Sequence, residues 1–386
     1  MTSISKPTIF LLAGRTGGPI MPVLAIAENL KNIEPIILGV QGGFESILAR
    51  QYNYIIEYLP QAKQHVQNTE NIFIKDRIIA FFRTFRILFL LSISVFKSIF
   101  LIFKYRPKVI ITAGSFLAIP LALACNITRI FGLSPRWIVH QQDVMAGKSN
   151  LYVAGRADIL TVAFQASKKN KHFGRAIVIP NPLDRGRFDV QNLLRINRRL
   201  QNENLPLYSL LHESGKPLLF VFGGGSGSLY LNQFIWNNLT TLLKKFRIIH
   251  LTGALIHNDT LASGEGYYTT DYLSFEQPLV LNKASVVISR SGMGTIAELL
   301  YLQKPGFLLP LPNTHQLQNA QSVDKFFTIL KHSEVIFSPQ SYHKEWVKQL
   351  LNWQSSSRQK KLQDWVKMEK LWQNYLKRVQ SLVELD

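Results

Sequence analysis

Three glycine-rich segments constrain the fold of this chain more than any other feature of its sequence. Residues 13–19 read AGRTGGP, residues 222–228 read FGGGSGS, and residues 289–298 read SRSGMGTIAE. Each follows a short apolar run and precedes the pattern of an amphipathic helix, so each predicts a tight turn between a buried strand and a helix. Strands that alternate with helices form parallel sheets with right-handed crossovers. The sequence therefore predicts an α/β fold.

A polar stretch at residues 184–211 divides this pattern into two series. Because both series repeat the order strand, glycine turn and helix, they predict two Rossmann-like parallel-sheet domains that face one cleft. We expect an N-terminal domain over 1–184, a C-terminal domain over 185–340 and a helical tail over 341–386. The tail carries four tryptophans that need a surface to cover, either across the domains or on another subunit: Trp346, Trp353, Trp365 and Trp372.

The charge of the chain indicates an anionic partner. Lys and Arg total 44 against 24 Asp and Glu, which gives a formal net charge of +20. Such an excess fits nucleic acid, a phosphate-bearing substrate or an anionic membrane surface. The sequence contains no recognisable nucleic-acid-binding module, so we expect no nucleic acid as a partner. The single cysteine, Cys125, excludes an internal disulfide and a cysteine-based zinc site, and it fits a reducing compartment.

The motifs of common cofactor and metal sites are missing from the sequence. The first glycine turn has neither the G-x-G-x-x-G pattern of a dinucleotide site nor a following Gly-Lys-Ser/Thr, which disfavours NAD and a Walker-type loop. No H-E-x-x-H motif appears, and Ser226 lacks the Gly-x-Ser-x-Gly spacing of a hydrolase. We therefore expect neither a cofactor nor a metal ion.

Each polar motif has a structural interpretation beside a functional one. The glycine turns fit either a phosphate held by backbone N–H groups or a plain bend. Glu298, near the first turn of its expected helix, either accepts both hydroxyls of a ribose or complements the helix dipole, and taken alone the second interpretation is favoured. His315 and Gln316 suit the hydroxyls of a sugar, or belong to a capped helix start with a surface histidine.

Residues 140–143, HQQD, end another predicted strand. Their structural interpretation is a polar strand end, with Asp143 as a helix cap and His140 as a core histidine whose hydrogen bonds are satisfied. All these motifs lie at carboxyl ends of predicted strands, the side on which parallel sheets bind ligands. Their coincidence at that side indicates a binding site more strongly than any one of them.

Residues 71–108 combine apolar and basic side chains, with eight Lys and Arg against one acid, Asp76. The segment fits a pair of core helices whose basic side chains reach solvent, or an interfacial helix on a membrane. Its longest uncharged apolar run, residues 87–96, is too short to cross a bilayer, and the N-terminus does not resemble a secretory signal. We expect peripheral attachment to an anionic membrane surface, at the cytoplasmic face of the cell membrane.

Taken in order, seven segments of the chain resemble glycosyltransferase family 28. They read AGRTGGPIMPVLAIAENL, ITAGSFLAIPLALA, VHQQDVMAGKSN, VIPNPLD, FGGGSGSLYLNQ, SRSGMGTIAELL and HQLQNAQ, within residues 8–335. The resemblance implies a GT-B fold that holds the nucleotide sugar mainly in the C-terminal domain, without a tightly bound metal. It also implies inverting transfer of N-acetylglucosamine from UDP-GlcNAc to a polyprenyl-diphosphate-linked muramoyl-peptide acceptor, which converts lipid I to lipid II in peptidoglycan synthesis.

The resemblance also implies roles for individual residues. Glu298 would bind the ribose, the backbone near Leu273 would meet uracil, and His315 and Gln316 would contact the N-acetylglucosamine. The donor diphosphate would be faced by residues of two turns: Gly224, Gly225, Ser226, Gly227, Ser228, Ser291, Gly292 and Thr295. The acceptor diphosphate would be faced by the first turn, with Thr16, Gly17 and Gly18, and Asn181 would lie at the hinge.

The acceptor half departs from the family pattern. Pro19 stands where the family has a histidine, and Gln141 stands where it has a glutamate. Proline offers no base and no backbone donor, so Asp143 is the first candidate for the catalytic base and His140 the second. These departures leave two alternatives open: a family 28 transferase that acts on another lipid such as diacylglycerol, and a non-catalytic subunit that binds a UDP-sugar.

Overall fold

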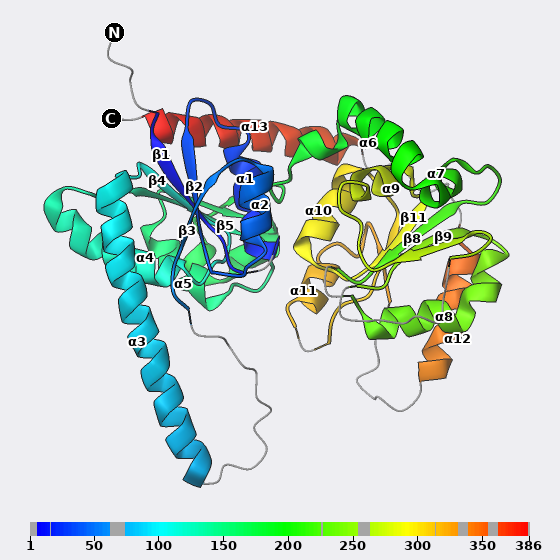
Figure 1. Cartoon of the computed structure of the whole chain (residues 1–386), viewed down its shortest axis with the longest axis horizontal. Coiled ribbons are helices and arrows are strands. Elements are labelled where there is room, and N and C mark those ends of the chain that lie inside the picture. The colour runs from blue at the N-terminus through cyan, green and yellow to red at the C-terminus, as the bar shows by residue number, and fades with distance from the viewer. Residues whose placement is uncertain are drawn as a thin grey trace. The chain divides into compact units, whose positions relative to one another are not determined.

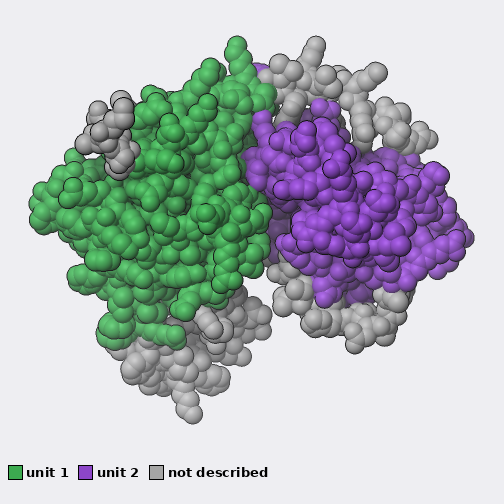
Figure 2. Space-filling view, turned by 45° about the horizontal axis from the view of Figure 1, so that its top comes forward, with its two compact units in different colours: residues 1–182, 368–386 green, residues 183–367 purple. Residues whose placement is uncertain are grey.

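The computed structural model describes residues 6–15, 17–61, 74–224, 227–253, 263–312, 314–330, 339–353 and 362–384, with side chains described throughout except at 74–83, 339–343 and 362–366. The chain divides into two compact units (Figure 2). One contains residues 1–182 and 368–386, and the other contains residues 183–367. Each unit holds one parallel sheet, which confirms the predicted α/β class with two parallel-sheet domains.

The first unit is built on a seven-stranded sheet in the order β3-β2-β1-β4-β5-β6-β7 (Figure 1). Its strands are β1 (Thr8–Leu12), β2 (Glu34–Gly39), β3 (Ile55–Tyr58), β4 (Val109–Thr112), β5 (Arg136–Gln141), β6 (Ile159–Val162) and β7 (Ile177–Val178). Its helices are α1 (Gly17–Ala27), α2 (Glu45–Gln51), α3 (Ile74–Tyr105), α4 (Ala118–Thr128), α5 (Lys148–Val153) and most of α13 (Leu362–Glu384). Short 3-10 helices lie at Arg129–Phe131 (η1), Ala154–Arg156 (η2), Gln165–Lys169 (η3) and Lys171–Phe173 (η4).

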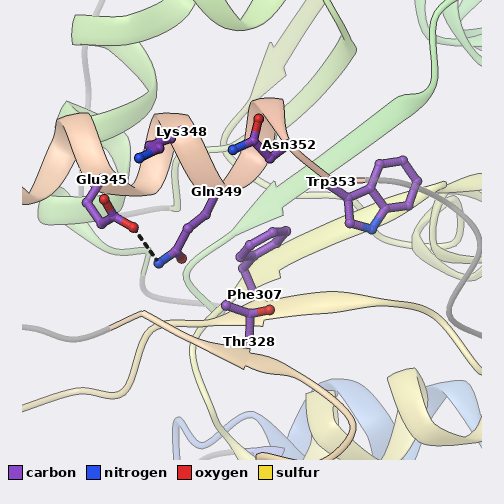
Figure 3. A pocket seen from close by; sticks show the side chains of 7 residues that line it. All are labelled: Phe307, Thr328, Glu345, Lys348, Gln349, Asn352 and Trp353. Atoms are coloured by element: carbon purple, nitrogen blue, oxygen red, sulfur yellow. Dashed lines mark hydrogen bonds between the residues drawn. The ribbon is translucent and has the colours of Figure 1, made fainter.

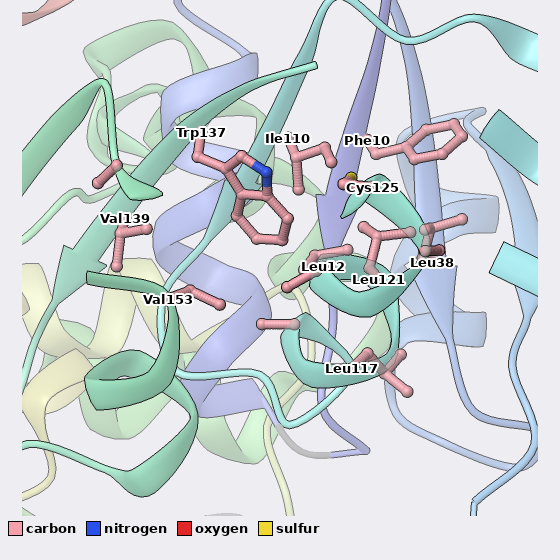
Figure 4. Packing of buried hydrophobic residues seen from close by; sticks show 14 of the residues in the cluster. Phe10, Leu12, Leu38, Ile110, Leu117, Leu121, Cys125, Trp137, Val139 and Val153 are labelled. Atoms are coloured by element: carbon pink, nitrogen blue, oxygen red, sulfur yellow. The ribbon is translucent and has the colours of Figure 1, made fainter. Parts of the chain in front are cut away.

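Alternation of side chains along the strands produces an apolar layer on each face of this sheet. Phe10 and Leu12 of β1 belong to the layer that α3, α4 and α5 complete (Figure 4). Ile9 and Leu11 belong to the opposite layer, which α1, α2 and α13 complete. Because both faces are covered, the strands are continuous apolar runs in the sequence, and this is why the sequence could locate them.

The second unit contains a six-stranded parallel sheet in the order β10-β9-β8-β11-β12-β13. Its strands are β8 (Leu218–Phe222), β9 (Arg247–Leu251), β10 (Tyr267–Thr270), β11 (Val286–Ser289), β12 (Gly306–Leu308) and β13 (Thr328–Ile329). Its helices are η5 (Arg185–Phe188), α6 (Val190–Glu203), α7 (Leu205–His212), α8 (Leu229–Leu243), α9 (Gln277–Lys283), α10 (Met293–Tyr301), α11 (Gln316–Gln321) and α12 (Pro339–Leu351). Leu219 and Val221 of β8 pack in one buried cluster with Phe234 of α8 and Trp346 of α12.

The basic and apolar segment forms one helix of 32 residues, α3, in place of the pair of core helices that the sequence left open. Its stretch Thr84–Tyr105 is long and apolar enough to cross a membrane by length and composition, with 22% of the most apolar window buried. Lys97 divides this stretch into two uncharged apolar runs, so the longest such run is still residues 87–96, as the sequence indicated. Core helices meet the same criterion, and Leu101 and Ile102 near the end of α3 are indeed buried in the core.

Candidate functional site

The predicted donor residues of the second unit gather at the carboxyl ends of β8 and β11. The chain runs from β8 outward to β9 and β10 and returns to β11 on the other side of β8. Open parallel sheets bind ligands at such a topological switch point. The turn at 222–228 follows β8, and the loop at 289–292 follows β11. Two of the three glycine segments therefore leave neighbouring strands at the switch point.

Gly227 lets the turn after β8 lie against the loop after β9. Its φ is +80°, and a Cβ atom built on it would lie 2.1 Å from the backbone oxygen of Thr252. The same oxygen accepts a hydrogen bond of 2.9 Å from Nδ2 of Asn232 on α8. The turn, the β9 loop and the start of α8 are thus held together at this point, and a side chain larger than hydrogen does not fit at 227.

Ser228 at the end of this turn caps α8. Its Oγ accepts a hydrogen bond of 3.3 Å from the N–H of Leu231, and its side chain is buried. Gly224 is exposed, with φ +85° and no atom within 4 Å of a built Cβ. Gly225 and Ser226 lie outside the described residues. The part of the turn that is described therefore combines an open glycine with a serine already bound to its helix, and the diphosphate role of the turn stays a prediction.

A buried polar network that the sequence analysis missed supports the same turn. The ring of His250 on β9 contacts Oδ1 of Asn232 through Nε2 and the hydroxyl of Tyr267 through Nδ1, both at 3.0 Å. Burial lowers the pKa of His250 to about 3, so the ring is neutral at physiological pH. The network holds the side-chain amide of Asn232 in place. Asn232 in turn donates to the backbone oxygen of Thr252, against which Gly227 packs. His250 is 18 residues from Asn232 and 17 residues from Tyr267 in sequence, so no local motif predicts that the three side chains meet.

Among the described residues, no side chain caps the backbone N–H groups at the start of α10. Gly292 is the N-cap residue, and within the described part of the chain no side chain caps it and no acid occupies the first turn. Built Cβ atoms at Gly292 and Gly294 would meet nothing within 4 Å, and Thr295 is half-buried. Ser291 is buried, and its Oγ donates a hydrogen bond of 2.8 Å to the backbone oxygen of Gln316. Uncapped N–H groups at a helix start favour an anion.

Glu298 lies deeper in α10 than the sequence predicted. It follows the helix start at Met293 by five residues, so it sits in the second turn, and the interpretation as a dipole-complementing acid of the first turn is wrong. The residue is 7% exposed, and its Oε1 accepts from Nη1 of Arg187 at 3.0 Å. Burial raises the pKa of Glu298, and the guanidinium of Arg187 opposes that rise. Arg187 could not be predicted as its partner from a local pattern, because it is 111 residues away in sequence.

The loop before α11 is shaped by Gln316. Its Oε1 accepts a hydrogen bond of 3.1 Å from the N–H of Leu311, whereas the neighbouring His315 is exposed. Arg290, after β11, donates from Nη1 to the backbone oxygen of Pro310 at 3.3 Å and ties this loop to the switch point. The side chain of Leu273, the predicted uracil-binding residue, is buried. The contacts of Leu273, His315 and Gln316 with a ligand stay predictions.

The switch point of the first unit lies between β1 and β4. The predicted acceptor turn follows β1, with Gly17 and Gly18 as the first residues of α1 and Thr16 outside the described residues. Nε2 of Gln142 donates to the backbone oxygens of Gly18 and Ala113, at 3.2 and 3.3 Å. One amide from the end of β5 thus joins the turn after β1 to the end of β4. Ring atoms of Pro19 lie close beside Gly14.

Asp143 is half-buried at this end of the sheet and is not the cap of α5, whose N-cap residue is Gly147. Its backbone oxygen accepts from Nε2 of Gln141 at 2.8 Å and from Oγ of Ser167 at 3.4 Å. Oε1 of Gln141 accepts from Nδ2 of Asn150 at 2.8 Å. The side chain at 141 therefore shapes the loop that carries Asp143.

His140 has the contacts of a core histidine. It is fully buried, with Nδ1 at 2.9 Å from Oγ1 of Thr161 and Nε2 at 2.9 Å from Oδ1 of Asn181. Burial lowers its pKa to about 4. Both ring nitrogens are engaged inside the unit, so the geometry favours the structural interpretation of His140 over a role as base, and it leaves Asp143 as the first candidate.

Two pockets lie away from these predicted residues. One, of about 330 Å³, lies between α12 and the strands β12 and β13, where Gln349 donates to Glu345 at 3.1 Å (Figure 3). The other, of about 810 Å³, lies along η5 and α6. Neither pocket is lined by a predicted site residue. In the described ranges, no three His, Cys, Asp or Glu side chains form a group that fits a metal ion.

The sequence matches the models of two domain families. The Glycosyltransferase family 28 N-terminal domain matches residues 9–160, and the Glycosyltransferase family 28 C-terminal domain matches residues 218–370. A relative from Clostridium kluyveri is 29% identical over 335 residues, which are 85% of this chain and 87% of that protein. A relative from Clostridium novyi is 26% identical over 330 residues, covering 83% and 84%. Both are UDP-N-acetylglucosamine–N-acetylmuramyl-(pentapeptide) pyrophosphoryl-undecaprenol N-acetylglucosamine transferases.

Solved structures share the fold. The crystal structure of Acinetobacter baumannii MurG aligns with a TM-score of 0.62 at 17% identity, over 98% of this chain and 99% of that one. A UDP-GlcNAc 2-epimerase from Neisseria meningitidis, bound to UDP-GlcNAc, aligns with a TM-score of 0.54 at 10% identity, over 98% and 94%. At these identities the likeness concerns the fold, which is the GT-B arrangement of two Rossmann-like units.

Proposed function

This chain belongs to glycosyltransferase family 28, and from that premise we propose that it transfers N-acetylglucosamine from UDP-GlcNAc to a polyprenyl-diphosphate-linked muramoyl-peptide, converting lipid I to lipid II. The observation that carries the donor half of the proposal is the open start of α10 with Glu298 buried one turn behind it. Two relatives that each align with more than four fifths of this chain carry names describing the same transfer.

The second unit offers a nucleoside diphosphate two kinds of partner. The N–H groups at the start of α10 and at Gly224 suit the oxygens of the diphosphate, whereas the N–H of Gly227 already donates to the backbone oxygen of Gly224 at 3.0 Å. The carboxylate of Glu298, oriented by Arg187, suits the paired hydroxyls of the ribose. We infer that the same N–H groups stabilise the negative charge that grows on UDP as the glycosidic bond breaks.

The acceptor half needs a base, because an attacking hydroxyl must lose its proton in an inverting transfer. We propose Asp143 for this role, since it is half-buried after the carboxyl end of β5, the strand next to β4, and since Pro19 and the engaged His140 offer no alternative there. The test is turnover of Asp143→Asn, with UDP affinity measured in parallel. We expect turnover to fall by roughly 10²-fold or more while UDP affinity stays unchanged. Unchanged turnover would remove Asp143 from the role.

We propose that α3 attaches the protein to the anionic cytoplasmic leaflet, where a polyprenyl-diphosphate acceptor would be found. Five phenylalanines along the helix are 41 to 73% exposed: Phe85, Phe89, Phe96, Phe100 and Phe103. Ile130 and Phe131 of η1, 81 and 65% exposed, extend this surface, with the rings of Phe103 and Phe131 5.5 Å apart. Three basic residues on α3 or directly after it are exposed, Arg86, Lys104 and Arg106, and of these Lys104 pairs with Glu57 at 3.0 Å. Exposed apolar side chains beside basic ones are typical of interfacial helices.

The decisive experiment is incubation of the purified protein with labelled UDP-GlcNAc and lipid I, with diacylglycerol as the comparison acceptor. Labelled lipid II from lipid I, with no product from diacylglycerol, is the expected result. Product from diacylglycerol alone would favour the alternative of a family 28 transferase on another lipid, for which Pro19 and Gln141 are the motivating departures. UDP-GlcNAc binding without transfer to either acceptor would favour a non-catalytic sugar-nucleotide-binding subunit.

A further inference from the structure

We propose that Glu45, a buried acid at the beginning of α2, is a positioning residue that holds the acceptor-diphosphate turn in its working conformation. The inference rests on the proposed function, because it takes the turn at residues 14–18 as the part of the first unit that faces the acceptor. Glu45 is fully buried, and neither the glycine motifs nor the proposed chemistry uses it.

The carboxylate of Glu45 joins two segments that follow neighbouring strands. Its Oε1 accepts the N–H of Val40, after β2, at 2.7 Å and the N–H of Arg15, after β1, at 3.3 Å. The N–H of Phe44 donates in turn to the backbone oxygen of Arg15 at 3.1 Å. The backbone of Arg15 is therefore held on both sides by residues 44 and 45.

Arg15 needs such support. Its φ is +61°, in the left-handed region that a residue with a side chain adopts at a cost. Arg15 lies two residues before α1, which begins at Gly17, so we infer that its orientation influences where the amide groups at the start of α1 point. A change in the hold on Arg15 is thus a change in where these amides point.

The surrounding backbone is built around the Glu45 side chain. A Cβ atom on Gly43 would lie 2.4 Å from Cδ of Glu45, and a Cβ atom on Gly39 would lie 2.5 Å from its Cγ. Two glycines thus leave the space that this one carboxylate fills. Its Oε2 has no hydrogen-bond partner among the described residues, although a buried carboxylate oxygen is costly to leave unpaired. An apolar side chain would avoid that cost but would lose both N–H bonds, and bonds to a charged acceptor are the stronger ones.

Three variants test the proposal. Glu45→Gln keeps the volume and removes the charge. Gly43→Ala keeps the carboxylate and displaces it. Glu34→Gln is the matched control. Glu34 is exposed at the amino end of β2, whereas Glu45 binds the N–H of Val40 at the carboxyl end of that strand. Circular dichroism verifies that each variant is folded.

The first measurement is hydrogen–deuterium exchange of the peptide that spans residues 13–19. We expect exchange to become roughly tenfold faster in Glu45→Gln and in Gly43→Ala and to stay unchanged in Glu34→Gln, because a weaker hold lets the turn open more often. The second measurement is the pair of KM values. We expect the KM for lipid I to rise roughly tenfold in both variants while the KM for UDP-GlcNAc stays within about twofold.

Each outcome decides between the inference and a merely structural role. Unchanged exchange at residues 13–19 in folded Glu45→Gln would overturn the inference, whatever the activity. A parallel rise of both KM values would likewise overturn it, because the substitution would then disturb both substrate sites and not acceptor positioning alone. If exchange accelerates as expected while the wild-type protein forms no lipid II, the hold of Glu45 on the turn stands and the proposed function fails.

Discussion

Glu298 and Arg187 form an ion pair in which the acid is almost fully buried. We expect Glu298→Gln to lower the free energy of unfolding of the second unit by about 1 to 3 kcal/mol, because the amide leaves the guanidinium without its counter-charge. The same variant should weaken UDP binding roughly tenfold, since a neutral amide accepts ribose hydroxyls less strongly than a carboxylate. Urea unfolding and calorimetric titration with UDP measure the two effects.

Glu203→Gln is the matched control for this prediction. Glu203 pairs with Arg199 at 2.7 Å on the surface of α6, with both side chains about half exposed. Its loss should change the free energy of unfolding by no more than about 0.5 kcal/mol and leave UDP affinity unchanged. Equal destabilisation by the two substitutions would contradict the argument that burial of the ion pair matters. Unaltered UDP affinity in Glu298→Gln would show that this acid does not bind the ribose.

His140 makes the stability of the first unit depend on pH. Burial lowers its pKa from 6.5 to about 4, so the unfolded chain binds a proton more readily than the folded one. The stability that the neutral ring contributes is therefore complete at pH values above 6.5, the pKa in the unfolded chain. This stability is lost as the pH falls toward about 4, the pKa in the folded chain. At about pH 4.5 the loss amounts to roughly 2 to 3 kcal/mol. Urea unfolding of the first unit at a series of pH values should show a flatter pH dependence in His140→Gln than in the wild type.

His250 provides an internal comparison for this experiment. Its pKa is lowered to about 3 by burial in the second unit, so the sign of its effect is the same. The pH dependence of the second unit should therefore persist in His140→Gln. A first unit that retains the wild-type pH dependence after the substitution would show that other groups are responsible for it.

At the scale of elements, the turn between β8 and α8 depends on the close approach of Gly227 to the loop after β9. Gly227→Ala would place a methyl carbon 2.1 Å from the backbone oxygen of Thr252, so the turn must move away from the β9 loop. We expect a roughly tenfold or greater loss of UDP affinity, because backbone amides bind a diphosphate only when they are correctly oriented. Gly215→Ala is the control, since Gly215 also has a positive φ of +104° but has no atom within 4 Å of a built Cβ. It should cost about 1 kcal/mol or somewhat more of stability without affecting UDP. Similar UDP affinities in the two variants would show that the close contact at 227 does not matter for the donor.

The helix α3 should carry membrane binding through its exposed apolar side chains. Phe96 and Phe100 are 73 and 61% exposed, so Phe96→Ser with Phe100→Ser removes apolar area at little cost to the core. Each phenylalanine that enters a membrane surface contributes about 1.5 to 3 kcal/mol, and the double variant should bind anionic liposomes at least roughly tenfold more weakly. Co-sedimentation at low salt is the measurement.

The control for α3 is an equal change on another exposed apolar surface. Val190→Ser with Leu194→Ser alters two side chains of α6 that are 73 and 50% exposed. These changes should leave liposome binding as it is. Failure of the wild-type protein to bind anionic liposomes would remove the membrane from the proposal, and equal weakening by both double variants would mean that α3 is not the responsible element.

For the molecule as a whole, the sequence predicted the features that short-range patterns encode. Buried strands covered on both faces are uninterrupted apolar runs, and glycine turns mark where they end, so both parallel sheets could be predicted. The switch points that gather the motifs follow from the same pattern. Long-range contacts were not predictable in this way. The pair of Arg187 with Glu298 and the hold of Glu45 on Arg15 join residues 111 and 30 positions apart, and no periodicity relates them.

Two local features were also misjudged, each for a physical reason. Glu298 was expected near the first turn of its helix, as an acid that complements the dipole, but Gly292 serves as the N-cap and the helix begins early enough, at Met293, to place the acid in the second turn. Residues 71–108 were interpreted, as one of two possibilities, as a pair of core helices, but a single long basic side chain such as Lys97 does not interrupt a helix, and α3 continues through it.

The C-terminal helix supplies the last part of the first unit's core. Residues from 368 onward belong to that unit although the second unit lies between them in sequence. Five of their side chains complete the layer over α1 and α2 and are at most 8% exposed: Trp372, Tyr375, Leu376, Val379 and Val383. The side-chain amide of Gln380 also pairs with the backbone of Lys31, accepting from its N–H at 2.9 Å and donating to its oxygen at 3.2 Å. The core of the first unit is therefore incomplete without α13.

Deletion of residues 368–386 tests this dependence. Burial of the five side chains stabilises the first unit by on the order of 10 kcal/mol before the entropy of ordering the helix is subtracted, which is comparable to the total stability of a domain. We expect limited proteolysis to degrade residues 6–182 of the deletion variant, while calorimetry shows UDP binding by the second unit unchanged. Trp372→Ala should give a graded effect of about 3 to 5 kcal/mol. A deletion variant whose first unit resists protease as the wild type does would mean that α1 and α2 close this layer without α13.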